Sequence, residues 1–598
     1  MCGIGGYVDP RGVLDGRLTL QCISSALMHR GPDGDGSYTD GGFGLAHRRL
    51  AIIDLSDTGA QPMEVGPIVV VLNGEIYNYR ELREQLRQEG EVFTGTSDTE
   101  VLARAYLRWG RECIDRLRGM WAFAIFDSRS RTLLCSRDPF GIKPFYYTWL
   151  KGAFLFASEP QALLRAGVAS AANLEVVAQY LAFGIVDHGQ GCFFDGIIQL
   201  GRGETVLIGA DATLRPVSRL DVTMQGTVRC TDEDFSLTLQ ESVRLHLRSD
   251  VPVGTCLSGG LDSSTVAAVA ASAVRQVGGP RFSAVTASSG VEANDERRYA
   301  GLVARECDLA WHVVQPDAGE FVAQIEECLR AQGEPALSPS VYFQYCVMRA
   351  ARAAGLKVML DGQGADELLC GYERYVPIWA RQVVRECGAL RAVRGFLQLG
   401  RNSRHGLRGI SSLAAYMLSP RLRRYVIARR TAMLRAELRP AVDKVIDHVT
   451  EASRDLRAAR IADLTTLSLP ALLRYEDRNS MAHSIEARVP YVDRAVATCA
   501  LSYPDTQLLH DGFTKYPLRK LAAQVLPPSI AWRPIKVGFE PPTHVWMGAL
   551  RERMRSQIEN STLLRRVCQD VPGLDSLPLA LQWRFYNVAS WQRMFSVQ

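Results

Sequence analysis

The second residue of the chain is a candidate nucleophile. The sequence begins MCGIGG, so loss of Met1 would leave Cys2 as the first residue. Its thiol would then share a residue with a free α-amine, whose pKa of about 7.7–8.0 makes it a base near neutral pH. An internal cysteine has no such base of its own. The same letters also fit an ordinary first strand, and the remaining motifs decide between the two interpretations.

A glycine-rich loop is typical of a phosphate site. The string LSGGLDSS, residues 257–264, lies between an apolar run and a helical pattern. Ser258, Gly259 and Gly260 allow a sharp turn whose backbone N–H groups, together with the positive end of the helix, bind anions. Asp262 could hold a magnesium ion against phosphate oxygens. No lysine follows the glycines, so the loop is not a kinase-type P-loop.

A second glycine-rich strand end follows as LDGQGADELLCGY, residues 360–372. In a parallel sheet it would face the first loop across the crevice at the carboxyl ends of the strands, where such folds bind ligands. Asp366 then offers a second carboxylate for magnesium. An Asp-Glu pair beside glycines is usually only a helix start, but the first loop favours the functional interpretation here.

Two patterns of secondary structure must position these groups. Short apolar runs predict strands at 68–75, 121–127, 132–138 and 153–159. Residues 79–90 predict an amphipathic helix, and 201–235 read as a closing hairpin and a linker. From 253 to 362 strand and helix patterns alternate, which predicts a parallel sheet covered by helices on both faces. From about residue 375 the chain is predicted to be mostly helical.

Composition limits the class of protein. At 598 residues the chain is expected to hold two or more domains, and its net charge of +5 predicts no nucleic-acid partner. Arginines crowd 381–460, where solvated helix faces are favoured over a phosphate- or RNA-binding surface. The 14 cysteines include no C-x-x-C pair, which favours reduced thiols over a disulfide framework or a zinc site. With no signal peptide and no apolar run of ~20 residues, we expect a cytoplasmic protein without a membrane partner.

Together the motifs resemble the asparagine synthetase B family, in which a class II, N-terminal-nucleophile glutaminase is fused to an ATP-pyrophosphatase synthetase. The matching strings are MCGI, HRGPD (29–33), LAHRRLAIID (45–54), QPM (61–63), NGEIYNYREL (73–82), SDTE (97–100), RDPFGIKPFYY (137–147), FASE (156–159), SDVPVGTCLSGGLDSS (249–264), GADE (364–367), RYEDRNSMAHSIEARVPYVD (474–493) and TKYPLRK (514–520). The resemblance implies an α/β protein with an αββα-sandwich glutaminase domain at 2–215. It also implies a doubly wound parallel-sheet ATP-pyrophosphatase domain with a helical extension at 231–598.

The resemblance implies that Cys2, freed by removal of Met1, attacks the side-chain amide of glutamine. Gly3 and Gly5 would leave room for the entering substrate. The Asn73 side chain and the Gly74 N–H group would form the oxyanion hole. Glutamine itself would be bound by Arg49 at its α-carboxylate, and by Asp98 and the backbone near Glu75 at its α-ammonium group.

For the second half, the resemblance implies ATP and magnesium as cofactors. The implied ATP-binding residues are Leu257, Ser258, Gly259, Gly260, Asp262, Ser263, Ser264, Val285, Asp361 and Gly362. Asp262 and Asp366 would bind the magnesium ion, and Lys515 in TKYPLRK matches the lysine that contacts the α-phosphate. Arg478 and Glu486 would either line the acceptor pocket or form structural ion pairs.

The implied reaction transfers ammonia from glutamine to a small-molecule carboxylate that ATP has adenylated, with release of AMP and pyrophosphate. Asparagine synthetases usually read S-G-E-G where this chain has DGQG, so Gln363 replaces a glutamate and Asp361 a serine. That glutamate is held to assist formation of the acyl-adenylate, and Gln363 cannot accept a proton. The acceptor is therefore open between aspartate and another carboxylate, such as a sugar acid or a secondary metabolite.

Three other interpretations share part of this pattern. Ring-closing synthetases of the β-lactam and lasso-peptide type use the same adenylation but generally lose the glutaminase site. Here Cys2, Arg49, Asn73 and Asp98 are all present. Phosphoribosyl and sugar-phosphate amidotransferases share the front half, and SGGLDSS argues against them. An inactive scaffold protein would be expected to have lost residues of these motifs. A homodimer is common in the family, and the sequence leaves the oligomeric state open.

Overall fold

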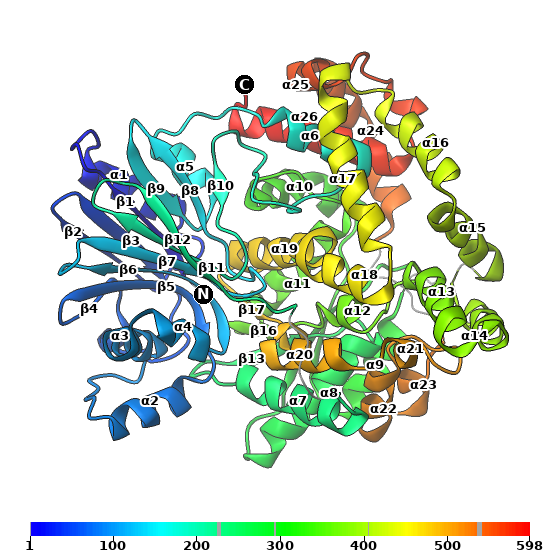
Figure 1. Cartoon of the computed structure of the whole chain (residues 1–598), viewed down its shortest axis with the longest axis horizontal. Coiled ribbons are helices and arrows are strands. Elements are labelled where there is room, and N and C mark those ends of the chain that lie inside the picture. Colours follow the sequence, from blue (N-terminus) through cyan, green and yellow to red (C-terminus); the bar gives the residue numbers. More distant parts are fainter. Residues whose placement is uncertain (1, 224–228, 292–294, 405, 535–540) are drawn as a thin grey trace.

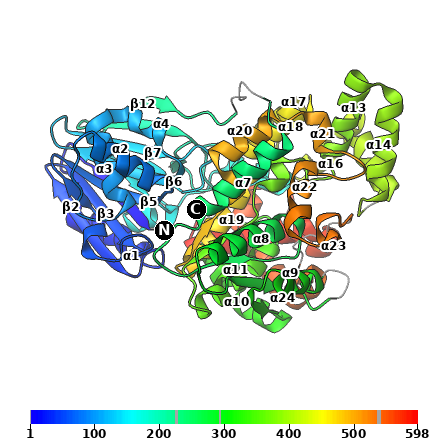
Figure 2. The ribbon, with the colours of Figure 1, turned by 90° about the horizontal axis from the view of Figure 1, so that it is seen from below.

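The computed structural model of the chain describes residues 2–223, 229–291, 295–404, 406–534 and 541–598. Its strands form two sheets in the N-terminal half and one in the C-terminal half of this described part. The N-terminal strands lie at one end of the molecule and a large helical region lies at the other (Figures 1 and 2).

Two six-stranded antiparallel sheets pack face to face in the N-terminal half. The first follows the order β10 (Ile198–Gln199), β8 (Tyr146–Leu150), β9 (Ala153–Ala157), β1 (Gly3–Val8), β3 (Phe43–Arg49) and β2 (Gly34–Asp40). The second follows the order β12 (Leu214–Arg219), β11 (Glu204–Gly209), β7 (Thr132–Arg137), β6 (Gly119–Asp127), β5 (Ile68–Ile76) and β4 (Met63–Val65). Buried side chains such as Ile4, Val71, Phe126 and Phe156 fill the space between them.

Helices cover the outer faces of both sheets. α1 (Gly16–Ala26) and α5 (Pro160–Arg165) pack on the first sheet, and α3 (Asp98–Trp109) packs on the second beside α2 (Tyr79–Gln88). α3 begins at Asp98 because the Ser97 side chain accepts the Glu100 N–H group as an N-cap. The predicted αββα sandwich is therefore the observed one, and the four predicted strands and the helix at 79–90 are confirmed.

The C-terminal half contains the predicted parallel sheet. Its order is β15 (Ala310–Val314), β14 (Ser283–Ala287), β13 (Val253–Cys256), β16 (Val358–Leu360) and β17 (Glu486–Arg488), and all four pairings are parallel. α7 (Asp232–His246) and α8 (Leu261–Gln276) lie on one side, with α10 (Ala318–Gln332) and α11 (Ser340–Ala353) on the other (Figure 1). The strand order reverses between β13 and β16, which makes the carboxyl ends of these strands the expected ligand crevice.

From about residue 375 the described part of the chain is mostly helical, as predicted. The long helices are α13 (Tyr375–Cys387), α14 (Ala389–Arg401), α15 (Gly406–Leu418), α16 (Pro420–Thr431), α17 (Arg439–Ala452), α19 (Leu469–Ala482), α22 (Tyr516–Val525), α24 (Thr543–Asn560) and α26 (Leu579–Phe595). On α13 and α14, Arg385, Arg391 and Arg394 are exposed, which fits solvated helix faces. The chain end returns to the N-terminal half, where the Gln598 N–H group donates to the Ser170 carbonyl at 2.9 Å.

The prediction of reduced thiols is wrong for one pair of cysteines, while the other twelve are free. Cys230, just before α7, forms a disulfide with Cys499 on α20 (Arg494–Ser502), and their Cα atoms are 5.3 Å apart. α7 and α20 pack against each other, which brings together two cysteines that are 269 residues apart in the sequence.

Among the described residues, no helix is both long enough and apolar enough to cross a bilayer.

Candidate active sites

The first candidate site surrounds Cys2, which is buried at the start of β1. Its backbone nitrogen, the α-amine once Met1 is removed, donates to Asn73 Oδ1 at 3.0 Å. Its carbonyl oxygen accepts from Arg30 Nε at 3.1 Å. Burial raises the pKa of the Cys2 thiol, so the thiol needs a base to become a nucleophile.

Asn73 and Gly74 lie together in β5, where it pairs with β6. Gly74 has φ +151°, and a Cβ atom there would overlap the Met120 carbonyl oxygen, so this position requires glycine. Asn73 is fully buried; because its Oδ1 faces the Cys2 nitrogen, its Nδ2 is directed elsewhere. That Nδ2 has no hydrogen-bond partner in the described part of the chain, so it is a buried donor that an oxyanion could use.

The predicted glutamine-binding residues converge on the same region. Arg48 pairs with Gly3 across β3 and β1, which places Arg49 level with Cys2. The Arg49 guanidinium donates to the Ser56 carbonyl at 2.8 Å and to the Asp54 carbonyl. Asp98 Oδ2 accepts the Ile76 N–H group at 2.9 Å, close beyond Asn73 along β5.

Two carboxyl groups of this region, those of Asp98 and Glu75, are buried, and burial disfavours their charged forms. Burial raises the pKa of Asp98 to about 6. Burial, the Glu486 carboxylate and Asp98 raise the pKa of Glu75 well above its usual range. An ammonium group entering between them would relieve this repulsion, as the predicted binding of the glutamine α-ammonium requires.

Gly3 and Gly5 have a different role from the predicted one. A Cβ atom on Gly3 would lie 2.8 Å from Leu27 Cβ, and one on Gly5 would overlap Ile23 Cγ2. Ile23 is on α1 and Leu27 caps its C-terminal end. These glycines therefore allow α1 to pack closely on β1, and the interpretation that they make room for substrate is wrong.

The second candidate site is a cavity of about 350 Å³ at the carboxyl ends of β13 and β16. Its lining includes ten predicted residues: Leu257, Ser258, Gly260, Asp262, Ser263, Val285, Asp361, Gly362, Gln363 and Asp366. Gly259, Ser264 and Lys515 are not part of the lining, and Ser264 is fully buried in α8. α8 begins at Leu261, and its N-cap residue Gly260 supplies no side-chain cap, which leaves N–H groups of the first turn for an anion.

The two carboxylates that are predicted to bind magnesium both contact the ammonium group of Lys515. Lys515 Nζ lies 2.6 Å from Asp262 Oδ2 and 2.6 Å from Asp366 Oδ1. Lys515 precedes α22 and is almost fully buried. Since one ammonium group reaches both carboxylates, they are close enough to bind one divalent ion with phosphate oxygens. Among the described residues, no cluster of three or more His, Cys, Asp and Glu side chains could hold a metal, so phosphate or water would complete the shell.

Sequence reasoning missed several residues of this cavity, among them Glu296, Gln344, Tyr372 and Tyr475. It also missed Glu476, a fully buried carboxyl on α19 that accepts a hydrogen bond from Gln344. Burial and the neighbouring Asp361 raise the pKa of Glu476 well above its usual range, and burial raises that of Asp361. A charged residue inside RYEDRN gives no sign of burial, because such side chains are usually exposed.

Arg478 and Glu486 form buried ion pairs, and neither lines the cavity. Arg478 Nη1 lies 2.8 Å from Glu159 Oε1 in the N-terminal half. Glu486 Oε1 accepts from Arg488 Nε at 2.6 Å. Of the two alternatives for these residues, the structure favours the structural ion pairs.

Known proteins match the chain over both halves. The glutamine amidotransferase domain family matches residues 1–217, and the asparagine synthase family matches residues 234–585. The chain is 31% identical over 590 residues to asparagine synthetase [glutamine-hydrolyzing] 1 of Bacillus subtilis, covering 94% of this chain and 90% of the relative. It is 33% identical over 592 residues to a putative asparagine synthetase [glutamine-hydrolyzing] of Mycobacterium tuberculosis, covering 92% and 89%. A solved glutamine phosphoribosylpyrophosphate amidotransferase from B. subtilis covers 52% of this chain and 81% of its own, with 17% identity and a TM-score of 0.28. The chain therefore belongs to the asparagine synthase family and is an ATP-dependent ligase with a glutamine amidotransferase domain.

Proposed function

We propose that the protein hydrolyses glutamine at Cys2 and uses the ammonia to amidate a small-molecule carboxylate. The thiol attacks the glutamine amide, ammonia leaves, and water releases glutamate from the thioester. At the second site the acceptor carboxylate displaces pyrophosphate from ATP to form an acyl-adenylate. Ammonia then displaces AMP to give the amide. The observation that carries this proposal is one chain holding both the Cys2–Asn73 pair and a cavity lined by Asp262 and Asp366, which share the ammonium group of Lys515.

Different residues of the second site would bind different parts of ATP and its magnesium ion. Ser258, Gly260 and Ser263, which line the cavity, would supply N–H and hydroxyl groups for the pyrophosphate, and Leu257 and Val285 would pack against the nucleotide. Asp262 and Asp366 would hold magnesium, which neutralises phosphate charge when bound. The Lys515 ammonium group, now shared by both carboxylates, could then pair with the phosphate at which charge develops. We propose that residues 2–215 form the glutaminase domain and that residues 231–598 form the ATP-pyrophosphatase domain.

The identity of the acceptor carboxylate is a separate question, and Gln363 is the residue that is relevant to it. Gln363 and Asp361 both line the cavity, where the family usually has a glutamate and a serine. The amide of Gln363 cannot act as a base. This supports a second candidate, a specialised amidotransferase for which aspartate is a poor acceptor.

The test measures pyrophosphate, AMP and glutamate together, with ATP, magnesium, glutamine and a panel of carboxylic acids that includes aspartate. Equal amounts of the three products with one acid support amide synthesis. Efficient turnover of aspartate, with kcat/KM unchanged in Gln363→Glu, contradicts the specialised acceptor. A wild type that releases neither pyrophosphate with any acid nor glutamate from glutamine contradicts the proposed function.

A further inference from the structure

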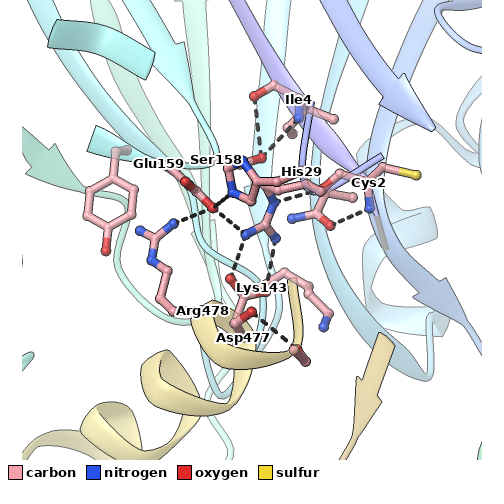
Figure 3. Close-up of polar contacts among 12 residues, drawn as sticks. Cys2, Ile4, His29, Lys143, Ser158, Glu159, Asp477 and Arg478 are labelled. Atoms are coloured by element: carbon pink, nitrogen blue, oxygen red, sulfur yellow. Dashed lines mark hydrogen bonds and ion pairs between the residues drawn. The ribbon is translucent and has the colours of Figure 1, made fainter. Parts of the chain in front are cut away.

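A buried ion-pair network joins the first site to a helix of the other half (Figure 3). Arg30 follows α1, is fully buried, and donates from Nε to the Cys2 carbonyl oxygen at 3.1 Å. Its two terminal nitrogens donate to Asp477 of α19, to Oδ2 at 2.8 Å and to Oδ1 at 2.9 Å. This bidentate geometry fixes the plane of the guanidinium as well as its position.

Glu159 closes the network within the N-terminal half. Its Oε1 lies 3.1 Å from His29 Nε2, 2.8 Å from Arg30 Nη1 and 2.8 Å from Arg478 Nη1. Burial alone would raise the pKa of Glu159, but the neighbouring His29 and Arg478 hold it well below its usual range. The carboxylate is therefore charged, and α19 is tied to the first site through both Asp477 and Arg478.

Both ends of the nucleophile residue are held by this arrangement. Asn73 accepts from the Cys2 nitrogen, and Arg30 donates to the Cys2 carbonyl oxygen. Asn73 is fixed in β5, where it pairs with Ala122 of β6, whereas Arg30 lies in a loop. The orientation of the Arg30 guanidinium therefore depends on the carboxylates that it contacts, one of which belongs to the other half of the chain.

We propose that Asp477, a residue of the synthetase half, is a positioning residue for glutamine hydrolysis. It holds Arg30, and Arg30 sets the direction of the Cys2 peptide and so the approach of thiol and amine to the amide carbon. The inference rests on the proposed glutaminase function. A displacement of about 1 Å at a reacting group can cost about 10²-fold in rate, so a modest shift of Arg30 suffices.

The chain offers a matched control at the same boundary between halves. Asp493 binds Arg118 of the N-terminal half in the same bidentate way, with distances of 2.8 Å and 3.1 Å, and is also buried. Neither residue contacts Cys2 in these interactions. Asp493→Asn therefore removes one buried ion pair between the halves without touching the network, while its amide oxygen can still cap α20.

The experiment compares full-length wild type, Asp477→Asn and Asp493→Asn. We expect glutamate release by Asp477→Asn to fall about 10²-fold in kcat, with ammonia-dependent pyrophosphate release near wild type. Asp493→Asn should keep both activities. A second readout is the rate of Cys2 alkylation by iodoacetamide as a function of pH, followed by peptide mass. We expect the profile to shift in Asp477→Asn only.

Either of two results with the asparagine variants would overturn the proposal. One is an Asp477→Asn variant that hydrolyses glutamine and alkylates like wild type. The other is an Asp493→Asn variant that loses as much glutaminase activity, since any ion pair between the halves would then suffice. If Asp477→Asn does not fold, Asp477→Glu keeps the charge and displaces it by one methylene. A wild-type rate in that variant also refutes positioning. A wild type that releases no glutamate contradicts the proposed function instead, and the alkylation profiles still decide the role of Asp477.

Discussion

Replacing Asn73 by alanine tests the first site most directly. Asn73 is fully buried, its Oδ1 accepts from the Cys2 nitrogen at 3.0 Å, and its Nδ2 has no partner among the described residues. A buried donor left without a partner costs about 1–3 kcal/mol. Such a cost is understandable if the donor is used in the reaction, where a tetrahedral oxyanion would supply the missing acceptor.

The size of the effect follows from that geometry. Loss of one oxyanion-hole donor costs about 2.7–4 kcal/mol in the barrier, or about 10²–10³-fold in kcat. We expect this loss in glutamate release by Asn73→Ala, with ammonia-dependent pyrophosphate release unchanged. Asn73→Asp keeps an acceptor for the Cys2 nitrogen but repels the oxyanion, so it should be at least as slow. An Asn73→Ala variant within about threefold of wild type in kcat would refute the oxyanion role, given the size of that expected loss.

Three further predictions separate the two sites. Cys2→Ala should abolish glutamine hydrolysis while ammonia-dependent synthesis survives, measured as glutamate and pyrophosphate release; parallel loss of both in a folded variant would contradict two separate sites. Asp262→Asn and Asp366→Asn should each strongly reduce adenylation, because an amide is a weaker magnesium ligand, and should leave glutaminase activity intact. Normal pyrophosphate release in either variant would contradict the assignment of that carboxylate to magnesium. The pKa of Asp98 is raised to about 6 by burial, so its carboxylate is lost as the pH falls below that value. The KM for glutamine should then rise about tenfold per pH unit, and a constant KM between pH 7.5 and 5 would exclude Asp98 from binding the ammonium group.

Patterns that act over short stretches predicted much of the fold. The alternation from 253 to 362 predicted the parallel sheet, and the glycines of LSGGLDSS predicted the loop between β13 and α8, because strand period, helix period and turn chemistry are local properties. Asn73 and Gly74 are a different case, since their role as an oxyanion hole was implied by the family resemblance alone. The resemblance likewise assigned Lys515 to the α-phosphate, but its contacts with Asp262 and Asp366 were not predicted.

Contacts between distant segments could not be predicted in this way. Arg30 and Asp477 are 447 residues apart, and although each lies in a string that matches the family, no spacing pattern links the two. The disulfide between Cys230 and Cys499 has no spacing pattern either. Gly5 was misread for the same reason, because the side chain that excludes a Cβ there comes from Ile23 on a helix and has no sequence signature.

The position of α19 explains why its charged residues are buried. Glu476 lies beside Asp361, which lines the second cavity, whereas Asp477 and Arg478 contact Arg30 and Glu159 of the first half. Adjacent helical residues point in directions about 100° apart, so a single turn can contact both centres. Buried charges are costly unless paired, and here each half supplies the partners that the other needs. The two halves are therefore joined by charge pairs that depend on correct docking, and a shift of α19 at the second cavity would displace Arg30 and with it the Cys2 carbonyl group.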